Sequence, residues 1–354
     1  MNNYILGLSY FQHSIKGERT MIQKLRTSTL LIALAIAVAS VTGNASAQDK
    51  GKKYLRIAML APRGSVVERM FKKIDKHLRD ATNNEWGLRI YASGAAGDEK
   101  DVIRKMRVGQ MDSAIVTTTG LSQIVREVAI LDTPGIVTSY EDIKKIEDAM
   151  WDEWQKMFLK NNVKLIKWYP AGRYRVFTNG PVTSANDLKS HRPWLWPESF
   201  VLKELWRTIG ATGVPLAVQD VYGALQTGMI DTFVSTCMST VAMQWHTKVN
   251  HMTAKPTGVL LLAWVINQKA WDSLPQAAKD VIEKDAIAFA EDSQRDAEKE
   301  EDASCKNLLK RGFKLSRAKD QDEVEKKVRD RVTGRIFSAE LRQRLEKVTG
   351  HSAD

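Results

Sequence analysis

Residues 54–116 read YLRIAMLAPRGSVVERMFKKIDKHLRDATNNEWGLRIYASGAAGDEKDVIRKMRVGQMDSAIV. Three short, mostly apolar runs in this stretch, at 54–61, 88–91 and 112–116, are typical of strands. Residues 66–81 carry apolar side chains at steps of three and four, which predicts an amphipathic helix, and a second helix is expected over 98–108. This strand–helix alternation predicts a parallel sheet with crossover helices, so the first part of the chain is α/β.

The rest of the chain continues the alternation. A helix is expected over residues 141–158 and a strand over 163–168, and strands and helices alternate again from 215 to 265. Residues 276–310 contain few helix breakers, and Pro275 suits a helix start because its missing N–H is not needed there. We expect one helix of about 50 Å, long enough to tie two lobes together.

Composition narrows the class of protein. The 354 residues suit two domains of roughly 100–200 residues each. With 43% hydrophobic and 27% charged residues, the chain has an ordinary globular composition, which excludes wholesale disorder and a multi-span membrane protein. The net charge of +11 is spread among acidic residues, and no nucleic-acid-binding motif is present, so we expect no nucleic acid as partner.

The N-terminal segment resembles an export signal. Lys24 and Arg26 precede an apolar run at residues 30–41, and Ala45-Ser46-Ala47 is a small-x-small cleavage site. The run is too short to span a bilayer, which favours a signal peptide over residues 1–47, with Met21 as a possible true start. A buried N-terminal helix or a single anchor is the alternative. We therefore expect export to a bacterial periplasm and a mature protein that is not embedded in the membrane.

Motifs for catalysis or metal binding are missing. The sequence contains no HExxH, GxSxG, Walker A or strand-linked GxGxxG pattern, and its six histidines are scattered. We expect no metal, no cofactor and no enzymatic activity. Because sequence alone does not bring Cys237 and Cys305 within disulfide distance, two buried free thiols are favoured over a disulfide.

Several motifs, in order, resemble the solute-binding subunits of TRAP transporters, the tripartite ATP-independent periplasmic systems, of the dicarboxylate-binding (DctP) type. The similarity runs from about residue 54 to 312, and its most specific piece is Tyr-x-Ala-Leu-Gln-Thr-Gly-x-Ile-Asp at 222–231. The other motifs are Gly97-Asp98, Gly109-x-Met111-Asp112, Arg175-x-x-Thr178-Asn179, Pro181-Val182 with Asp187-Leu188-Lys189, Gly-Ala-x-x-Val-Pro at 210–215, and Leu274-Pro275.

The resemblance implies a two-lobe periplasmic binding protein with mixed, mostly parallel sheets and a ligand cleft between the lobes. It places lobe 1 at residues 48–172 plus about 257–285, and lobe 2 at 173–256 plus about 286–354. Such a protein captures a small molecule by lobe closure and delivers it to TRAP membrane subunits without a reaction. A binding module for a sensor or another exported partner, or a secreted enzyme using Asp220 and Asp231, remains the alternative.

One departure from the family pattern concerns the ligand. Trp194 stands where most members carry an arginine that clamps the ligand carboxylate, a task that suits the planar guanidinium fork. Arg192, two residues earlier, is the candidate to replace that clamp. With indole in that place, an apolar or amphipathic ligand resting on Trp194 and Trp196 is favoured over a carboxylate, and a carboxylate over a cation.

The resemblance implies four further ligand contacts. Arg175 matches the family's first arginine, and Arg173 is its rival. Ser235 falls where many members have a ligand-contacting asparagine. Arg63 lies in the first strand-to-helix turn, where parallel strands end and clefts form.

Overall fold

The first three strands and the helices between them form as their hydrophobic pattern predicts. In the computed structural model, which describes residues 52–351, β1 (Lys53–Met59) pairs in parallel with both β2 (Trp86–Tyr91) and β3 (Ser113–Thr117). The crossovers are α2 (Val66–Ala81) and α3 (Glu99–Arg107). The predicted signal peptide and Met21 lie outside the described residues.

Helix α2 shows why the local pattern is reliable. Ser65 caps its N-terminus by accepting a hydrogen bond from the Glu68 backbone N–H. Its predicted apolar stripe buries Phe71, Ile74 and Leu78 against the sheet and the long helix.

The sheet is completed by strands from later in the chain. Its order is β10-β8-β4-β9-β3-β1-β2, and β7 also pairs with β4. The additional strands are β4 (Val163–Thr178), β7 (Thr232–Ser235), β8 (His251–Thr253), β9 (Gly258–Asn267) and β10 (Lys314–Ser316); β5 (Trp194–Leu195) and β6 (Val214–Pro215) form a separate pair.

The sheets are mixed, as expected, but the predicted predominance of parallel pairing needs correction. In the part of the chain that the structure describes, four strand pairings are parallel and four are antiparallel. The four antiparallel pairings are β9 with β3, and β4 with β7, β8 and β9. These partners are distant in sequence, so the local alternation of strands and helices does not reveal their direction.

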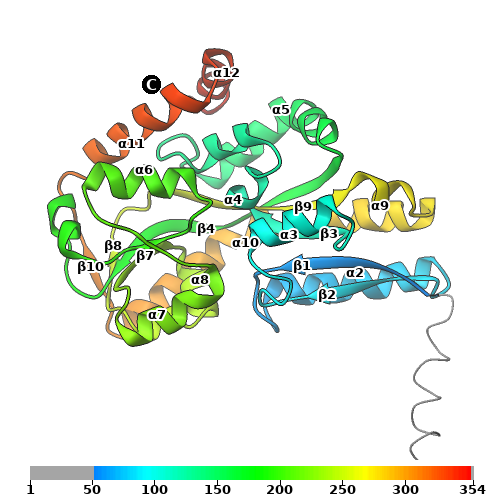
Figure 1. Cartoon of the computed structure of the whole chain (residues 1–354), viewed down its shortest axis with the longest axis horizontal. Coiled ribbons are helices and arrows are strands. Elements are labelled where there is room, and N and C mark those ends of the chain that lie inside the picture. Colours follow the sequence, from blue (N-terminus) through cyan, green and yellow to red (C-terminus); the bar gives the residue numbers. More distant parts are fainter. Residues whose placement is uncertain (1–51, 352–354) are drawn as a thin grey trace, which may run out of the picture. The chain divides into compact units, whose positions relative to one another are not determined.

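The long strand β4 connects the two lobes of the fold. Its first part pairs with β9 as far as Tyr174, and from Arg175 onward it pairs with β7. Figure 1 shows β1, β2 and α2 on one side, and β7, β8, β10 and α7 (Val221–Thr227) on the other. The change of pairing partner lies close to the boundary proposed between residues 172 and 173 and supports that division, which stays a proposal.

The long helix forms where the sequence predicts it. Helix α10 (Gln276–Lys310) has 35 residues, begins after Pro275, and contacts α2, β4 and α8 (Cys237–Ala242). The remaining helices are α4 (Thr118–Leu121), α5 (Tyr140–Lys160), α6 (Phe200–Ile209), α9 (Gln268–Asp272), α11 (Gln321–Ile336) and α12 (Ala339–Thr349), with 3-10 turns η1 (Arg126–Asp132), η2 (Ala185–Ser190), η3 (Val218–Asp220) and η4 (Trp245–Thr247). None of the described helices is both long enough and apolar enough to cross a membrane.

The prediction of two free thiols is wrong. Cys237 and Cys305 form a disulfide, with their Cα atoms 5.2 Å apart. The bond fastens the start of α8 to α10 across a sequence separation of 68 residues. Sequence gives no measure of such a distance, because it depends on how α10 packs against the second lobe.

Candidate functional site

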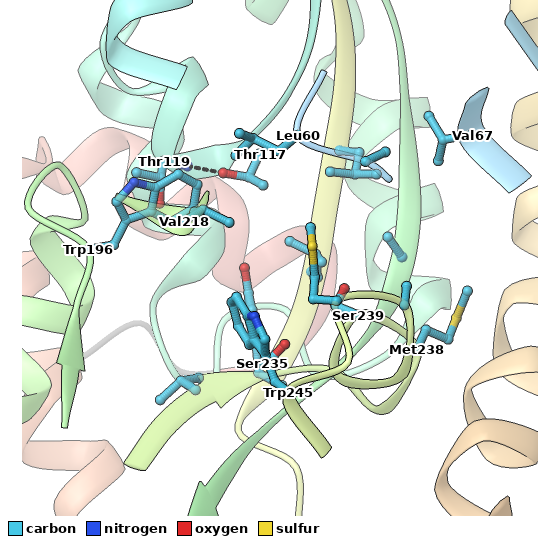
Figure 2. Close-up of a pocket in the computed structure, with 18 of the residues that line it drawn as sticks. Leu60, Val67, Thr117, Thr119, Trp196, Val218, Ser235, Met238, Ser239 and Trp245 are labelled. Carbon is cyan, nitrogen blue, oxygen red and sulfur yellow. Dashed lines mark hydrogen bonds between the residues drawn. The ribbon is translucent and has the colours of Figure 1, made fainter. Parts of the chain in front are cut away.

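A cavity of about 620 Å³ lies between the two parts of the fold. Residues from the β1–α2 connection, α3, β3 and β9 line one side, and residues from β7, α8 and the segment around β5 line the other. Figure 2 shows Thr117 and Thr119 across the open space from Ser235, Ser239 and Trp245, and it shows Trp196, which follows β5, beside Thr119. The walls are mainly aliphatic, with Leu60, Ile115, Val201, Leu202, Leu205, Val218, Val234, Val241, Leu260 and Leu262 among the lining side chains.

Three tryptophans build the aromatic part of the wall. Trp194 stacks on Trp196 with ring centroids 5.8 Å apart, and its edge meets Trp245 at 5.5 Å. The Trp194 indole N–H donates to the Leu216 carbonyl oxygen at 2.9 Å, which holds the ring in one orientation. The predicted residues Trp194 and Trp196 are thus brought together at the cavity.

Ser235, predicted because it falls where many family members have a ligand-contacting asparagine, also lines the cavity. It is the last residue of β7, its side chain is buried, and it lies opposite Arg175 in the β4–β7 ladder. Its role toward a ligand stays a prediction.

Neither predicted arginine on β4 lines the cavity. The Arg175 guanidinium donates through Nη1 to the Thr253 carbonyl oxygen at 2.6 Å and to that of Ala254. Burial lowers the pKa of Arg175, and the nearby Glu301 carboxyl opposes that shift. Arg173 donates to Asp302 on α10 at 2.5 Å. Both side chains therefore have structural partners inside the protein.

The other two predicted arginines also lie away from the lining. Arg192 is exposed and pairs with Asp231, with Nη2 and Oδ2 3.3 Å apart. Arg63 is exposed in the β1–α2 turn, where its backbone N–H donates to Ser93 Oγ at 3.1 Å. Among the lining residues that the structure describes, Arg69 is the one cationic side chain, and it is exposed.

The carboxyl pair considered for an enzyme does not face this cavity. Asp231 accepts hydrogen bonds from the Arg192 backbone N–H at 2.9 Å and from the Thr232 hydroxyl at 3.0 Å. Desolvation works to raise the pKa of Asp231, but these hydrogen bonds and His191 outweigh it and hold the pKa below its ordinary value. Neither Asp220 nor Asp231 belongs to the lining, and Asp231 serves to join the β5 region to β7.

The sequence does not identify two acids of the lining, the buried Glu99 and the half-buried Asp132. Glu99 begins α3, is 3% exposed, and accepts hydrogen bonds from the Thr117 backbone N–H and hydroxyl, each at 2.8 Å. Burial raises the pKa of Glu99 to about 8. A Cβ at residue 120 would lie 2.5 Å from Glu99 Oε2, so the glycine there makes room for this carboxyl group.

Asp132 ends η1 and is the second acid. Burial raises its pKa to about 6, and weaker interactions with the hydroxyl groups of Thr118 and Tyr174 oppose the shift. Asp132 Oδ1 has no hydrogen-bond partner in the part of the chain that the structure describes. Burial raises the pKa of Tyr174, which also lines the cavity, and the charges of Asp132 and Glu99 add to this shift.

The sequence held a weak signal for these residues. Glu99 follows the Gly-rich turn after a strand, and Asp132 follows the buried apolar run at 128–131. Many surface acids occupy such positions. Only the tertiary structure turns these two inward.

One cluster in the described residues has the composition of a metal site, namely Cys237, Glu301 and Cys305. Its sulfur atoms are joined in the disulfide and so are not the thiolates that bind metal. Glu301 instead accepts hydrogen bonds from the backbone N–H groups of Cys237 and Met238, at 2.9 and 3.0 Å. The cluster therefore anchors α8 to α10.

Known proteins of similar sequence and fold are solute receptors rather than enzymes. The sialic acid-binding periplasmic protein SiaP of Vibrio cholerae is 20% identical over 277 residues, which cover 78% of this chain and 86% of the relative. The C4-dicarboxylate-binding periplasmic protein DctP of Rhodobacter capsulatus is 22% identical over 259 residues, covering 72% and 75%. The crystal structure of DctP7, a Bordetella pertussis extracytoplasmic solute receptor binding pyroglutamic acid, superposes with a TM-score of 0.76 at 16% identity, covering 84% of this chain and 99% of that one.

These comparisons agree with the architecture described above. The structural match establishes the two-lobe binding-protein fold, with a mixed sheet flanked by helices. The family model described as bacterial extracellular solute-binding protein, family 7, matches residues 57–337, which is most of the chain. The chain belongs to this family, the DctP family of TRAP solute-binding proteins.

Proposed function

We propose that this protein captures a small apolar or amphipathic solute by closing its two lobes around the cavity. The observation that carries the proposal is the lining itself, which is built from aliphatic side chains and three tryptophans and has Arg69, at its exposed edge, as its one cation among the described residues. Burying apolar ligand surface against such walls is favourable by roughly 25 cal/mol per Å². We propose Trp194, Trp196 and Ser235 as ligand contacts.

A simple dicarboxylate suits this cavity poorly. Sialic acid, pyroglutamic acid and C4-dicarboxylates, named for the relatives, all carry carboxylates, which need a cation or several N–H donors when buried. Arg175 and Arg173 bind other parts of the protein, and Arg192 and Arg63 are exposed outside the lining. The lining thus lends no support to these four arginines as ligand contacts.

Lobe closure gives the proposal its mechanism. A solute that contacts both walls stabilises the closed form, and it shifts the population only by its difference in affinity for the two forms. The strand β4 and helix α10 are shared by both lobes and are the elements about which closure takes place.

The setting proposed for this activity is the periplasm, reached through the signal peptide over residues 1–47. The closed, loaded form delivers its solute to TRAP membrane subunits, and no covalent chemistry takes place. Delivery to a sensor is the alternative, and transport assays with the membrane subunits distinguish the two.

Native mass spectrometry of the protein purified from periplasm, followed by identification of what it retains, tests the proposal. We expect a retained apolar or amphipathic molecule. Ser235→Leu places a larger side chain in the cavity wall and should weaken retention, whereas the matched control Ser273→Leu, at an exposed residue of the α9 C-terminus, should retain the molecule. Retention of a small hydrophilic organic acid would overturn the proposed ligand class.

A further inference from the structure

The polar groups of the cavity are acidic rather than basic. Among the described lining residues, the carboxyl-bearing side chains are Glu99, Asp132 and Glu300, and the cation is Arg69. The Arg69 side chain on α2 is exposed and donates to the Gly64 carbonyl oxygen in the turn before this helix. Buried charge in the cavity is therefore negative, which disfavours an anionic solute.

The half-buried Asp132 has hydroxyl neighbours, Thr118 and Tyr174, but no cationic partner among the described residues. It forms no ion pair with any Lys, Arg or His in the described part of the chain, and its Oδ1 accepts no hydrogen bond there. A buried carboxylate without a counter-charge is costly, and a ligand that brings both a positive charge and N–H donors removes that cost.

Glu99 and Asp132 differ in protonation state at neutral pH. Burial raises the pKa of Glu99 to about 8 and that of Asp132 to about 6, so at neutral pH Glu99 holds its proton and Asp132 is ionised. Tyr174 lies near both acids, since both charges act on its pKa. This end of the cavity thus presents one negative charge beside neutral hydroxyl and carboxyl groups.

Aromatic faces lie close to this acidic end. Trp196 interacts with Asp98, the residue before Glu99, and Figure 2 shows it beside Thr119. Thr119 in turn donates through its backbone N–H to the Thr117 hydroxyl at 3.1 Å, the same hydroxyl that contacts Glu99. Indole faces attract cations, and they do not favour carboxylates.

We propose that the solute is an amphipathic molecule with a protonated amine, whose ammonium group binds Asp132 beside Glu99 and Tyr174 while its apolar part fills the tryptophan-lined cavity. This inference rests on the proposed function and names its substrate class. An ammonium group supplies three N–H donors and the missing positive charge. The apolar part takes the place that Trp194, Trp196 and Trp245 surround.

Three probes of equal chain length test the head-group preference in the dialysed wild-type protein at pH 7. Isothermal titration with octylamine, octanol and octanoate varies only the polar group. We expect octylamine to bind at least ten-fold more tightly than octanoate, and more tightly than octanol. Equal or tighter binding of octanoate would overturn the amine assignment.

Asp132→Asn keeps the shape of the side chain and removes its charge. We expect octylamine to weaken at least ten-fold and octanol to change less than two-fold, whereas Asp148→Asn, an exposed acid on α5, should leave both unchanged. An unchanged ratio of octylamine to octanol in Asp132→Asn would refute the role of Asp132. If octanol binds without any amine preference, only this inference falls; if none of the three probes binds, the proposed function falls with it.

Discussion

Replacing Glu99 by glutamine should change the pH dependence of folding stability. Glu99 is 3% exposed, and burial raises its pKa from 4.5 to about 8. Between these two values the folded protein holds a proton that the unfolded chain releases, so stability falls as pH rises through this range. Below about pH 4.5 the carboxyl group is protonated in both states and costs nothing.

The size of the effect follows from the shift. Each pKa unit corresponds to roughly 1.4 kcal/mol, so the full shift amounts to a destabilisation on the order of 5 kcal/mol above pH 8. Glutamine mimics the protonated acid, since its carbonyl oxygen can accept from the Thr117 backbone N–H while its amide N–H donates to the Thr117 hydroxyl. We therefore expect Glu99→Gln to match the wild type near pH 4.5 and to exceed its stability by several kcal/mol at pH 8.

Urea unfolding followed by tryptophan fluorescence at pH 4.5, 6 and 8 measures this difference. Glu85→Gln is the matched control, because Glu85 is exposed in the turn before β2 and should show no pH-dependent gain. If Glu99→Gln differs from the wild type by the same amount at pH 4.5 and pH 8, Glu99 does not titrate as a buried acid, and the reasoning about the cavity's charge is wrong.

Two further predictions concern the elements that hold the lobes together. Removing the disulfide in a Cys237→Ala, Cys305→Ala double variant should lower the free energy of unfolding by about 4 kcal/mol, because the unfolded chain is no longer closed into a loop of 68 residues. Urea unfolding without reductant measures this loss, and a loss below about 1 kcal/mol would contradict the prediction. Gly172→Ala should lower stability by more than about 2 kcal/mol in the same assay, because Gly172 has φ +106° and a Cβ would lie 2.6 Å from that of Thr236. Gly228→Ala is the control, because Gly228 has φ +70° and open space around it. An equal loss of stability in Gly228→Ala would mean that backbone strain alone, and not the clash with Thr236, destabilises Gly172→Ala.

Part of the site could be predicted from sequence, because a motif shows where its residues lie along the backbone of the fold. Trp194, Trp196 and Ser235 were inferred from their places within family motifs, and all three line the cavity. Arg175, Arg173 and Arg192 are inferred from the same motifs, and Arg63 from its place in the first strand-to-helix turn. Their side chains nevertheless bind elsewhere or are exposed outside the lining. A sequence motif predicts where the backbone of a residue lies in the fold. The direction of a long charged side chain depends instead on the acids and carbonyl groups that surround it.

The local elements and the family follow from the amino-acid sequence alone. The bounds of α2 and α10 agree with the predicted residues 66–81 and 276–310, because apolar spacing, capping residues, proline and glycine act within a turn or two of the backbone. Tertiary structure alone decided the Cys237–Cys305 pairing, the antiparallel course of β4 and the inward turn of Glu99 and Asp132. These features join residues far apart in the chain, so they depend on the packing of the whole fold. No periodic pattern in the sequence predicts them.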